Sequence, residues 1–397
     1  MASVIFLTDF SESYARDLLL GISRYSHDVG EAWSICRFPL SIRDSHGIGF
    51  VVEYAKKIKA DAVIGQFYDN DDVSLFRKSG IIAIAQDFQN RFSSLINLTG
   101  EHYLTGQIGA DYLINKGFTN FAFYGSKDIV WSEERCHGFH ERLMNVNPDF
   151  SFSEFHSPND VMWNYDIEAT CQWLIDLPKP VAIMASDDNH AFYITEACRI
   201  ISITKGYSQV RIPEDISIWG VDNDESICKL SSPNLSSISQ NVEQGGYKVA
   251  ETIDDILSGK RSISDTRDIV VKVGPIIPRQ STDIFVNDDP NIAQVLKYIH
   301  MHISEKISVD ELVEQVPLSR RLLETRFHKA MGTSIYDYII RNRVDRIAHK
   351  LAEGLPVSEA AAELGISDIK NLSRAFKRIK GVSPSEYWKR KNKPRID

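Results

Sequence analysis

From residue 4 to about residue 273, short apolar runs alternate with stretches whose apolar residues recur every three or four positions. The runs that we expect to form strands are 4–7, 62–64, 81–85, 121–124, 181–184 and 216–221. Runs that are apolar on both faces and are separated by helical patterns are typical of parallel sheets with helices on both sides. The segment is therefore predicted to be a doubly wound α/β structure, long enough for two lobes.

The pattern changes at a polar stretch rich in turn-forming residues, 284–291, and is helical beyond it. Such a stretch between two periodic patterns is typical of a linker. We therefore expect two domains, residues 1–285 and 286–397. Within the first domain, the chain is expected to cross between lobes near residues 99–104 and again near 240, and these crossings would serve as hinges.

The helical segment contains one pattern twice, at residues 307–327 and 357–378. In each copy a serine that can cap a short helix (Ser308, Ser358) is followed by a serine that can cap a basic helix (Ser319, Ser367). Each basic helix carries apolar residues four positions apart, which share one face and can pack on the short helix. These apolar pairs are Leu323 with Phe327, facing Leu312 and Val316, and Leu372 with Phe376.

A helix with an apolar face toward its partner and polar side chains at its exposed N-terminal end is suited to enter the major groove of DNA. The pattern therefore predicts two helix-turn-helix units in an all-α domain. The side chains expected to contact DNA are Ser319, Arg320, Arg321, Glu324 and Thr325 in the first unit, and Lys370, Asn371, Ser373 and Arg374 in the second.

The distribution of charge agrees with this prediction. Residues 290–397 contain 20 Lys and Arg against 13 Asp and Glu, a net charge of +7, whereas residues 1–289 contain 25 against 41, a net charge of −16. A basic segment on an acidic body is typical of a nucleic-acid-binding module joined to a domain with another task. A solvated helical face is the alternative explanation of the charge alone.

On these residues the segment from about 291 to 388 resembles the AraC family of transcription regulators. The run FKRIKGVSPSEY at 376–387 is similar to the end of that family's domain, and residues 341–351 resemble its long linker helix. The sequence departs from the family at Pro317, where a small or polar residue is usual, and at Ile366 and Ser367, where an aromatic residue often follows the glycine. Neither departure removes the apolar faces.

Polar residues follow most of the predicted strands. They are Thr8 and Asp9, Asp69, Gly125 and Ser126, Ser186 to Asp188, and Asp222 to Asp224. Ligands of doubly wound folds bind at the carboxyl ends of the strands, and carboxylates and amides can bond adjacent hydroxyls of a sugar. Trp131, just beyond one strand end, is a candidate to stack on a sugar. The alternative for Asp187 or Asp188 is capping of the helix that follows.

Residues 4–282 resemble the sensing domains of lac-repressor-type regulators, which have the fold of periplasmic binding proteins. The motifs are IPEDISIWGVDN at 212–223, ERCHGF at 134–139, SISQ at 237–240 and PRQST at 278–282. A sensor of this kind joined to an AraC-type domain resembles the xylose-operon activators of bacteria, although Ala15 stands where those proteins carry an acidic residue. The resemblance implies ligand contacts at Arg135, Asp187, Asp222 and Gln240, and also at Arg16 and Asp69. For Arg135 the alternative is an ion pair with a carboxylate such as Glu134.

Together these features predict a sugar-responsive transcription factor that activates pentose utilisation genes, most simply those for xylose. The expected partners are double-stranded DNA, a pentose, RNA polymerase and a second copy of the chain, with no cofactor, metal ion or membrane. The alternative of a carbohydrate-processing enzyme with a basic tail finds no phosphate-binding loop, nucleophile elbow or zinc motif to support it. An exported transport protein is disfavoured by the absence of an export signal, and five scattered cysteines are typical of a reduced protein of the cytoplasm.

Overall fold

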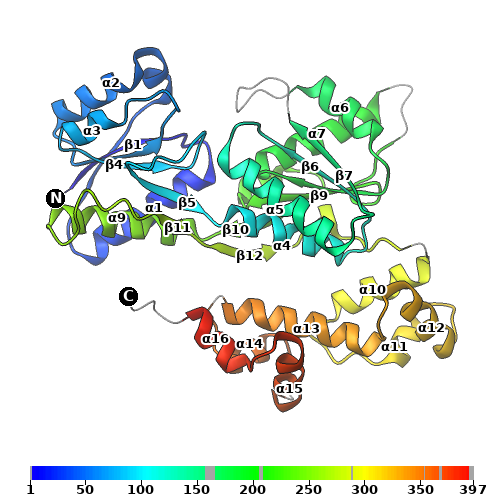
Figure 1. Ribbon diagram of the computed structural model, residues 1–397. Helices are drawn as coiled ribbons and strands as arrows, with labels where there is room; N and C mark the ends of the chain where they lie inside the picture. The colour runs from blue at the N-terminus through cyan, green and yellow to red at the C-terminus, as the bar shows by residue number, and fades with distance from the viewer. Residues whose placement is uncertain are drawn as a thin grey trace. The chain divides into compact units, whose positions relative to one another are not determined.

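The computed structural model describes residues 2–156, 166–204, 209–287, 289–352, 354–365 and 369–392 (Figure 1). The chain forms two compact units. The first contains Met1–Asn115 and Thr119–Asp283, and the second contains Lys116–Phe118 and Ile284–Asp397. The division after Asp283 lies two residues before the expected boundary. None of the described helices is both long and apolar enough to cross a membrane.

The first lobe of the first unit is built on a parallel sheet with the strand order β11-β5-β4-β3-β1-β2. Its strands are β1 (Ser3–Leu7), β2 (Ser34–Arg37), β3 (Ala62–Gln66), β4 (Ile82–Gln86), β5 (Ile96–Gly100) and β11 (Ile269–Val271). Side chains of α1 (Ser13–Asp28) and α9 (Val242–Leu257) form one core with the sheet. A second core joins it to α2 (Leu40–Ile58) and α3 (Ser74–Lys78).

The second lobe has the strand order β12-β10-β9-β8-β6-β7. Its strands are β6 (Asn120–Gly125), β7 (Ser151–His156), β8 (Val181–Ala185), β9 (Ile216–Asp222), β10 (Ser236–Gln240) and β12 (Val273–Ile277), and its helices are α4 (His102–Ile114), α5 (Val130–Val146), α6 (Ile167–Asp176), α7 (Asp188–Ile203), α8 (Glu225–Leu230) and η1 (Gln280–Thr282). The edge strand β12 pairs antiparallel with β10, so this sheet is mixed where an all-parallel one was expected.

Three crossings connect the lobes, one more than expected. They lie between β5 and α4, between β10 and α9, and between β11 and β12. Glu101 in the first crossing accepts hydrogen bonds from Lys272 Nζ (2.7 Å) and from the backbone N–H of Val273 (3.1 Å) in the third. The N–H of Asn241 in the second crossing donates to the carbonyl of Lys272 at 2.9 Å. The third crossing is thus hydrogen-bonded to each of the other two.

The second unit is entirely helical over its described residues, which confirms the predicted fold class. Its helices are α10 (Pro290–Met301), α11 (Val309–Glu314), α12 (Arg320–Met331), α13 (Ile335–Ala352), α14 (Val357–Glu363), α15 (Ile369–Lys380) and α16 (Pro384–Asn392). One core joins α10, α11 and α12 to the start of α13, and a second joins the rest of α13 to α14, α15 and α16.

Candidate functional site

A polar cavity lies between the two lobes. Its walls come from the carboxyl ends of strands and from the N-terminal parts of helices, which is where ligands of α/β folds bind. The lining residues are Glu12, Tyr14, Gln66, Gln86 and Asp87 from the first lobe, His102 at the start of α4, and Trp131, Arg135, Asp187 and Asp222 from the second lobe.

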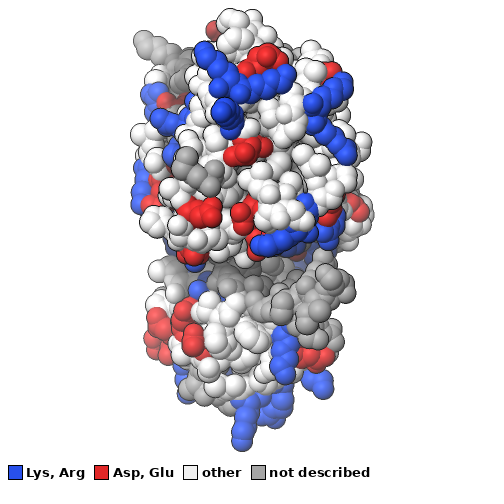
Figure 2. Space-filling model, turned by 90° about the vertical axis from the view of Figure 1, so that its left-hand side faces the viewer, with Lys and Arg blue, Asp and Glu red and all other residues white. Residues whose placement is uncertain are grey.

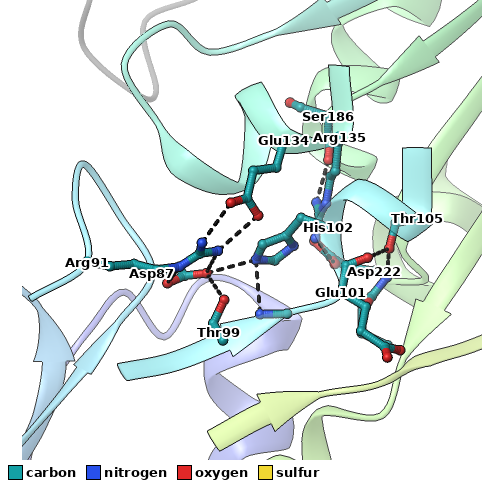
Figure 3. Close-up of polar contacts among 12 residues, drawn as sticks. Asp87, Arg91, Thr99, Glu101, His102, Thr105, Glu134, Arg135, Ser186 and Asp222 are labelled. Atoms are coloured by element: carbon teal, nitrogen blue, oxygen red, sulfur yellow. Dashed lines mark hydrogen bonds and ion pairs between the residues drawn. The ribbon is translucent and has the colours of Figure 1, made fainter. Parts of the chain in front are cut away.

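Arg135 reaches from α5 to two groups of the second lobe (Figure 3). Its Nη1 donates to the carbonyl of Ser186 at 2.5 Å and its Nη2 to Asp222 Oδ1 at 3.2 Å. Asp222 and Asn223 have φ angles of 93° and 54°, a left-handed backbone that residues other than glycine rarely adopt. Such strain is found mainly where a site requires it, and here it accompanies the pairing of the Asp222 carboxylate with Arg135.

The acidic groups of the cavity influence one another. Burial raises the pKa of Glu12 well above its ordinary value, and the charges of Asp187 and Asp222 raise it further. Burial also raises the pKa of Asp222, an effect that Arg135 opposes and Asp187 reinforces. A ligand that donates hydrogen bonds to these oxygens would therefore replace repulsion between carboxylates with favourable contacts.

Asp187 both caps a helix and lines the cavity. Its Oδ1 accepts from the backbone N–H of His190 at 2.8 Å, and its Oδ2 lies 2.7 Å from His190 Nδ1. Burial acts to raise the pKa of Asp187, but the charge and hydrogen bonds of His190 outweigh it and the pKa is lowered. Asp188 has a structural task instead, since its Oδ2 accepts from the backbone N–H of Asp224 at 2.7 Å.

Asp87 is the centre of a second polar network, shown in Figure 3. Its carboxylate accepts from Thr99 Oγ1 (2.5 Å) and from Arg91 Nε and Nη2 (both 3.0 Å), and lies 3.1 Å from His102 Nε2. Burial acts to raise the pKa of Asp87, yet the bonds from His102, Arg91 and Thr99 lower it. Burial lowers the pKa of His102 and so favours its neutral form.

Several buried polar atoms of the lining have no hydrogen-bond partner among the described residues. They are Gln86 Oε1, His102 Nδ1 and Arg135 Nε. Because a buried polar atom without a partner costs about 1–3 kcal/mol, such atoms at a cavity favour a ligand that supplies donors and acceptors. Within the same described residues, no group of three or more His, Cys, Asp and Glu side chains is placed to hold a metal ion.

Four of the seven side chains expected to contact a ligand line the cavity: Trp131, Arg135, Asp187 and Asp222. The structure places the other three outside its lining. Asp69 is exposed in the loop after β3. Gln240 ends β10 at a hinge and donates to Thr105 Oγ1 at 3.4 Å. Arg16 instead forms an ion pair with Asp224 at 2.9 Å.

Six lining residues were not expected from the sequence: Glu12, Tyr14, Gln66, Gln86, Asp87 and His102. Three of them, Gln66, Gln86 and Asp87, end or follow strands and carry the same signal as Asp187 and Asp222. Ala15 is buried and carries no acidic group. The carboxyl group at the start of α1 that lines the cavity belongs to Glu12, three residues earlier. Arg135 does form an ion pair with a carboxylate, as its alternative proposed, but the partner is Asp222 at 3.2 Å, whereas Glu134 pairs with Arg91 at 2.7 Å.

The first helix-turn-helix unit has the predicted packing and caps. Leu323 and Phe327 of α12 are fully buried in one core with Leu312 and Val316. Ser308 and Glu311 form a reciprocal capping box, and Ser319 Oγ accepts from the N–H of Leu322 at 3.4 Å. The expected DNA-contacting side chains, Ser319, Arg320, Arg321, Glu324 and Thr325, are all exposed.

Besides Ser319, three of these exposed side chains already form hydrogen bonds within the unit. Arg320 donates to Asp310 Oδ1 at 3.1 Å and to Glu324 Oε1 at 3.2 Å, so both charges are partly neutralised within the unit. The Thr325 hydroxyl donates to the carbonyl of Arg321 at 2.8 Å, which leaves its oxygen as an acceptor.

The second unit has the same packing but a different start. Leu372 and Phe376 of α15 are buried against α13 and α14. Ser358 does not cap α14 as expected, because the helix begins at Val357 and Pro356 holds the N-cap position. Ser367, the other expected cap, lies outside the described residues. Lys370, Asn371 and Arg374 are exposed and Ser373 is half-buried.

Basic side chains gather on the end of the helical unit where α15 lies (Figure 2). Lys370, Arg374, Lys377, Arg378 and Lys380 all belong to this helix. Arg378 also donates to Asp337 Oδ1 of α13 at 3.2 Å. A helix with this density of positive charge at its surface is suited to the phosphates of DNA.

Two family models match parts of the chain. Residues 110–282 match the periplasmic binding protein-like domain, and residues 312–390 match a helix-turn-helix domain. The chain is 26% identical to the xylose operon regulatory protein of Haemophilus influenzae, with 97% of each chain covered. It is 25% identical to the protein of the same name from Escherichia coli strain K12, with 97% of this chain and 96% of the relative covered.

A solved structure described as a xylose-binding transcription activator has the same fold along the whole chain. It superposes with a TM-score of 0.58 at 22% identity and covers 97% of each chain. The fold and the order of the two domains thus agree with the full-length relatives. The chain is a transcription regulator, not an enzyme, in which a periplasmic-binding-protein-like domain precedes an AraC-type double helix-turn-helix domain.

Proposed function

We propose that this regulator binds a pentose, most simply xylose, in the interlobe cavity and then activates transcription of genes for its utilisation. The observation that carries the proposal is the cavity itself, whose lining combines carboxylates, an arginine and unpartnered polar atoms. The xylose-related names of the full-length relatives support the choice of a pentose.

The chemistry of the lining suits a small polyhydroxylated ligand. Asp187 and Asp222 can accept hydrogen bonds from sugar hydroxyls, and the free Nε of Arg135 and the ring of His102 can bond others. Trp131, whose ring lies 5.4 Å from the Arg135 guanidinium, offers an apolar surface for a sugar face. We assign these five residues as ligand contacts.

On the DNA side, we propose that α12 and α15 enter two successive major grooves, about 34 Å apart along the duplex. Arg321, Glu324, Thr325, Lys370, Asn371 and Arg374 would then reach base edges. Arg320, Ser319 and Ser373, together with the basic end of α15, would contact the backbone. The protein would act in the cytoplasm as a homodimer and recruit RNA polymerase.

A thermal-unfolding screen of the full chain against pentoses and hexoses tests the ligand. A sugar at 100 times its Kd stabilises the native state by about 2.7 kcal/mol, so at least one pentose should raise the unfolding temperature by several degrees. Asp222→Asn, which suits the left-handed backbone and removes the charge, should abolish this shift. Asp69→Asn, outside the cavity, should leave it unchanged. A flat response to every sugar would contradict the proposed ligand class.

A further inference from the structure

Two arginines of the first lobe form ion pairs with carboxylates of the second lobe, and neither lines the cavity. Arg91, in the loop after β4, meets Glu134 of α5. Arg16, in α1, meets Asp224, the N-cap residue of α8. Residues adjacent to each pair line the cavity: Asp87 beside Arg91 and Asp222 near Asp224. The pairs therefore border the cavity on both lobes.

Arg91 uses its guanidinium as a double fork (Figure 3). Nε and Nη2 donate to the two oxygens of Asp87 in its own lobe, each at 3.0 Å. Nη1 and Nη2 donate to the two oxygens of Glu134 in the other lobe, at 2.7 and 2.9 Å. Bidentate pairs of this geometry are among the stronger charge-assisted hydrogen bonds, and the planar fork of arginine is required for both at once.

Arg16 is held just as firmly on its own side. Its Nη1 donates to the carbonyls of Phe10 (3.2 Å) and Ser11 (2.5 Å), which directs Nη2 to Asp224 Oδ2 at 2.9 Å. Asp224 is itself fixed, because its Oδ1 caps α8 through the backbone N–H groups of Ser226 and Ile227. Both partners are thus held by contacts within their own lobes.

A backbone bond between the lobes lies beside the first pair. The N–H of Val130 donates to the carbonyl of Phe88 at 2.8 Å. Val130 is the first residue of α5, and an N–H at that position has no acceptor within its own helix. Its protection from hydrogen exchange therefore depends on contact between the lobes.

We propose that Arg16 and Arg91 are positioning residues that hold the two lobes together over the ligand cavity and so set the affinity for the ligand without touching it. The proposal rests on the proposed sugar-binding function. Separation of the lobes must break both pairs, so each pair favours the closed state. The apparent ligand affinity falls with the fraction of molecules that are closed, and loss of either pair therefore weakens binding.

The test measures two quantities on the full chain, the xylose Kd by calorimetry and the exchange rate of the Val130 amide without sugar. Glu134→Gln is the main variant, because it removes the charge and one of the two acceptor oxygens that bind Arg91 to the second lobe and leaves the Arg91–Asp87 pair intact. We expect it to raise the Kd about 5- to 20-fold and to speed exchange of Val130 by a similar factor. Arg16→Gln, with a more exposed pair, should raise the Kd about 3-fold.

Arg24→Gln is the matched control. Arg24 also lies on α1 and forms an ion pair, with Glu243 at 3.2 Å, but both partners belong to the first lobe. This variant should retain the wild-type Kd and exchange rate. Unchanged exchange in Glu134→Gln and Arg16→Gln, or equal effects of Arg24→Gln, would overturn the proposal.

The two readouts separate the two proposals. If the wild-type protein binds no sugar but Val130 exchanges faster in Glu134→Gln, the proposed ligand is wrong and the link between the lobes stands. If exchange becomes faster while the sugar Kd stays constant, the pair does not set affinity and this inference fails. Circular dichroism of each variant verifies that it is folded.

Discussion

Buried polar side chains in the first unit differ in whether the protein itself satisfies them. Arg43 is fully enclosed, pairs with Asp71, and has its guanidinium carbon 3.4 Å from the centre of the Tyr68 ring. His102 and Arg135, in contrast, each retain a buried nitrogen without a partner among the described residues. The first arrangement stabilises a loop, whereas the second leaves bonding capacity directed at a cavity. Burial alone would not have distinguished them.

One residue of the helical unit should make its stability depend on pH. The ring of His300 lies 4.3 Å from that of Phe285, and its Nε2 lies 2.9 Å from the Tyr338 hydroxyl. Burial lowers the pKa of His300 to about 3, and the charges of Lys116 and Arg346 act in the same direction. The unfolded chain, with an ordinary histidine pKa near 6.5, thus binds a proton first as the pH falls.

The contribution of His300 to the free energy of unfolding should therefore be fully present above pH 6.5. It should be lost progressively toward pH 3, by up to about 1.4 kcal/mol per pH unit. Replacement His300→Gln, which retains an acceptor for Tyr338, should flatten the decline between pH 7 and 5 in calorimetric unfolding of the full chain. His328→Gln, on an exposed position of α12, serves as the control. Identical pH profiles of wild type and His300→Gln would show that His300 is already solvated.

At the scale of elements, periodicity located six central strands and missed the strands at the sheet edges, together with β5 and β10 next to them. The runs that became β1, β3, β4, β6, β8 and β9 are apolar on both faces, because helices cover both sides of the sheet. The edge strands β2 and β7, with sequences SICR and SFSEFH, have no fully buried residue and so no continuous apolar run. These segments are strands because they pair with residues far away in the sequence, and a local sequence pattern does not reveal such pairing.

The second helix of each helix-turn-helix unit, α12 or α15 (the recognition helices), was predictable because apolar spacing and side-chain caps are both local. Ser319 caps α12 as expected, and Leu323 and Phe327 form its buried face. In the second unit Pro356 holds the N-cap position of α14, so this helix begins without the side-chain cap expected from Ser358. The apolar face, not the cap, was thus the reliable signal.

The two recognition helices should read different bases. Replacement Arg321→Ala or Asn371→Ala should cost about 1–3 kcal/mol at a single base position, because a good bidentate contact discriminates by that amount. Lys377→Ala, farther along α15, should weaken all sequences alike through loss of a phosphate contact. Binding to a panel of operator variants distinguishes these cases. Uniform weakening by the first two variants, or a footprint of one helical turn per protomer, would contradict the assignment.

At the scale of the whole molecule, the candidate site was only half predictable. The strand-end rule identified Asp187 and Asp222, which follow strands of one lobe. Glu12 and His102 enter the same cavity from the starts of α1 and α4, and His102 directly follows a crossing between lobes. Which helix starts face a cavity depends on how two lobes meet, and this is a property of the tertiary fold.

The division into two units predicts whether separate fragments of the chain fold and bind DNA. Phe285 and Ile292 are buried in the core of the helical unit, so a fragment 284–397 retains this core and a cut after residue 285 would remove Phe285 from it. Because each unit has its own core, fragments 1–283 and 284–397 should each fold. The helical fragment should bind DNA more weakly than the full chain if dimerisation depends on the sensor domain, since a paired site gains from effective concentration.

The last prediction concerns communication between sugar and DNA. A ligand can raise DNA affinity only if the conformation that binds the ligand more tightly also binds DNA more tightly, and we propose that closure of the two lobes is such a change. Coupling of the usual size, about 1–3 kcal/mol, would raise operator affinity of the full chain roughly 5- to 150-fold with xylose. The fragment 284–397 should show no response, and Asp222→Asn should lose the response yet retain basal DNA binding, because Asp222 lies in the cavity. Titration of the operator with and without sugar measures the coupling. Equal DNA affinities of the full chain with and without every sugar would refute it. Weaker basal DNA binding by Asp222→Asn would show that this residue supports the fold.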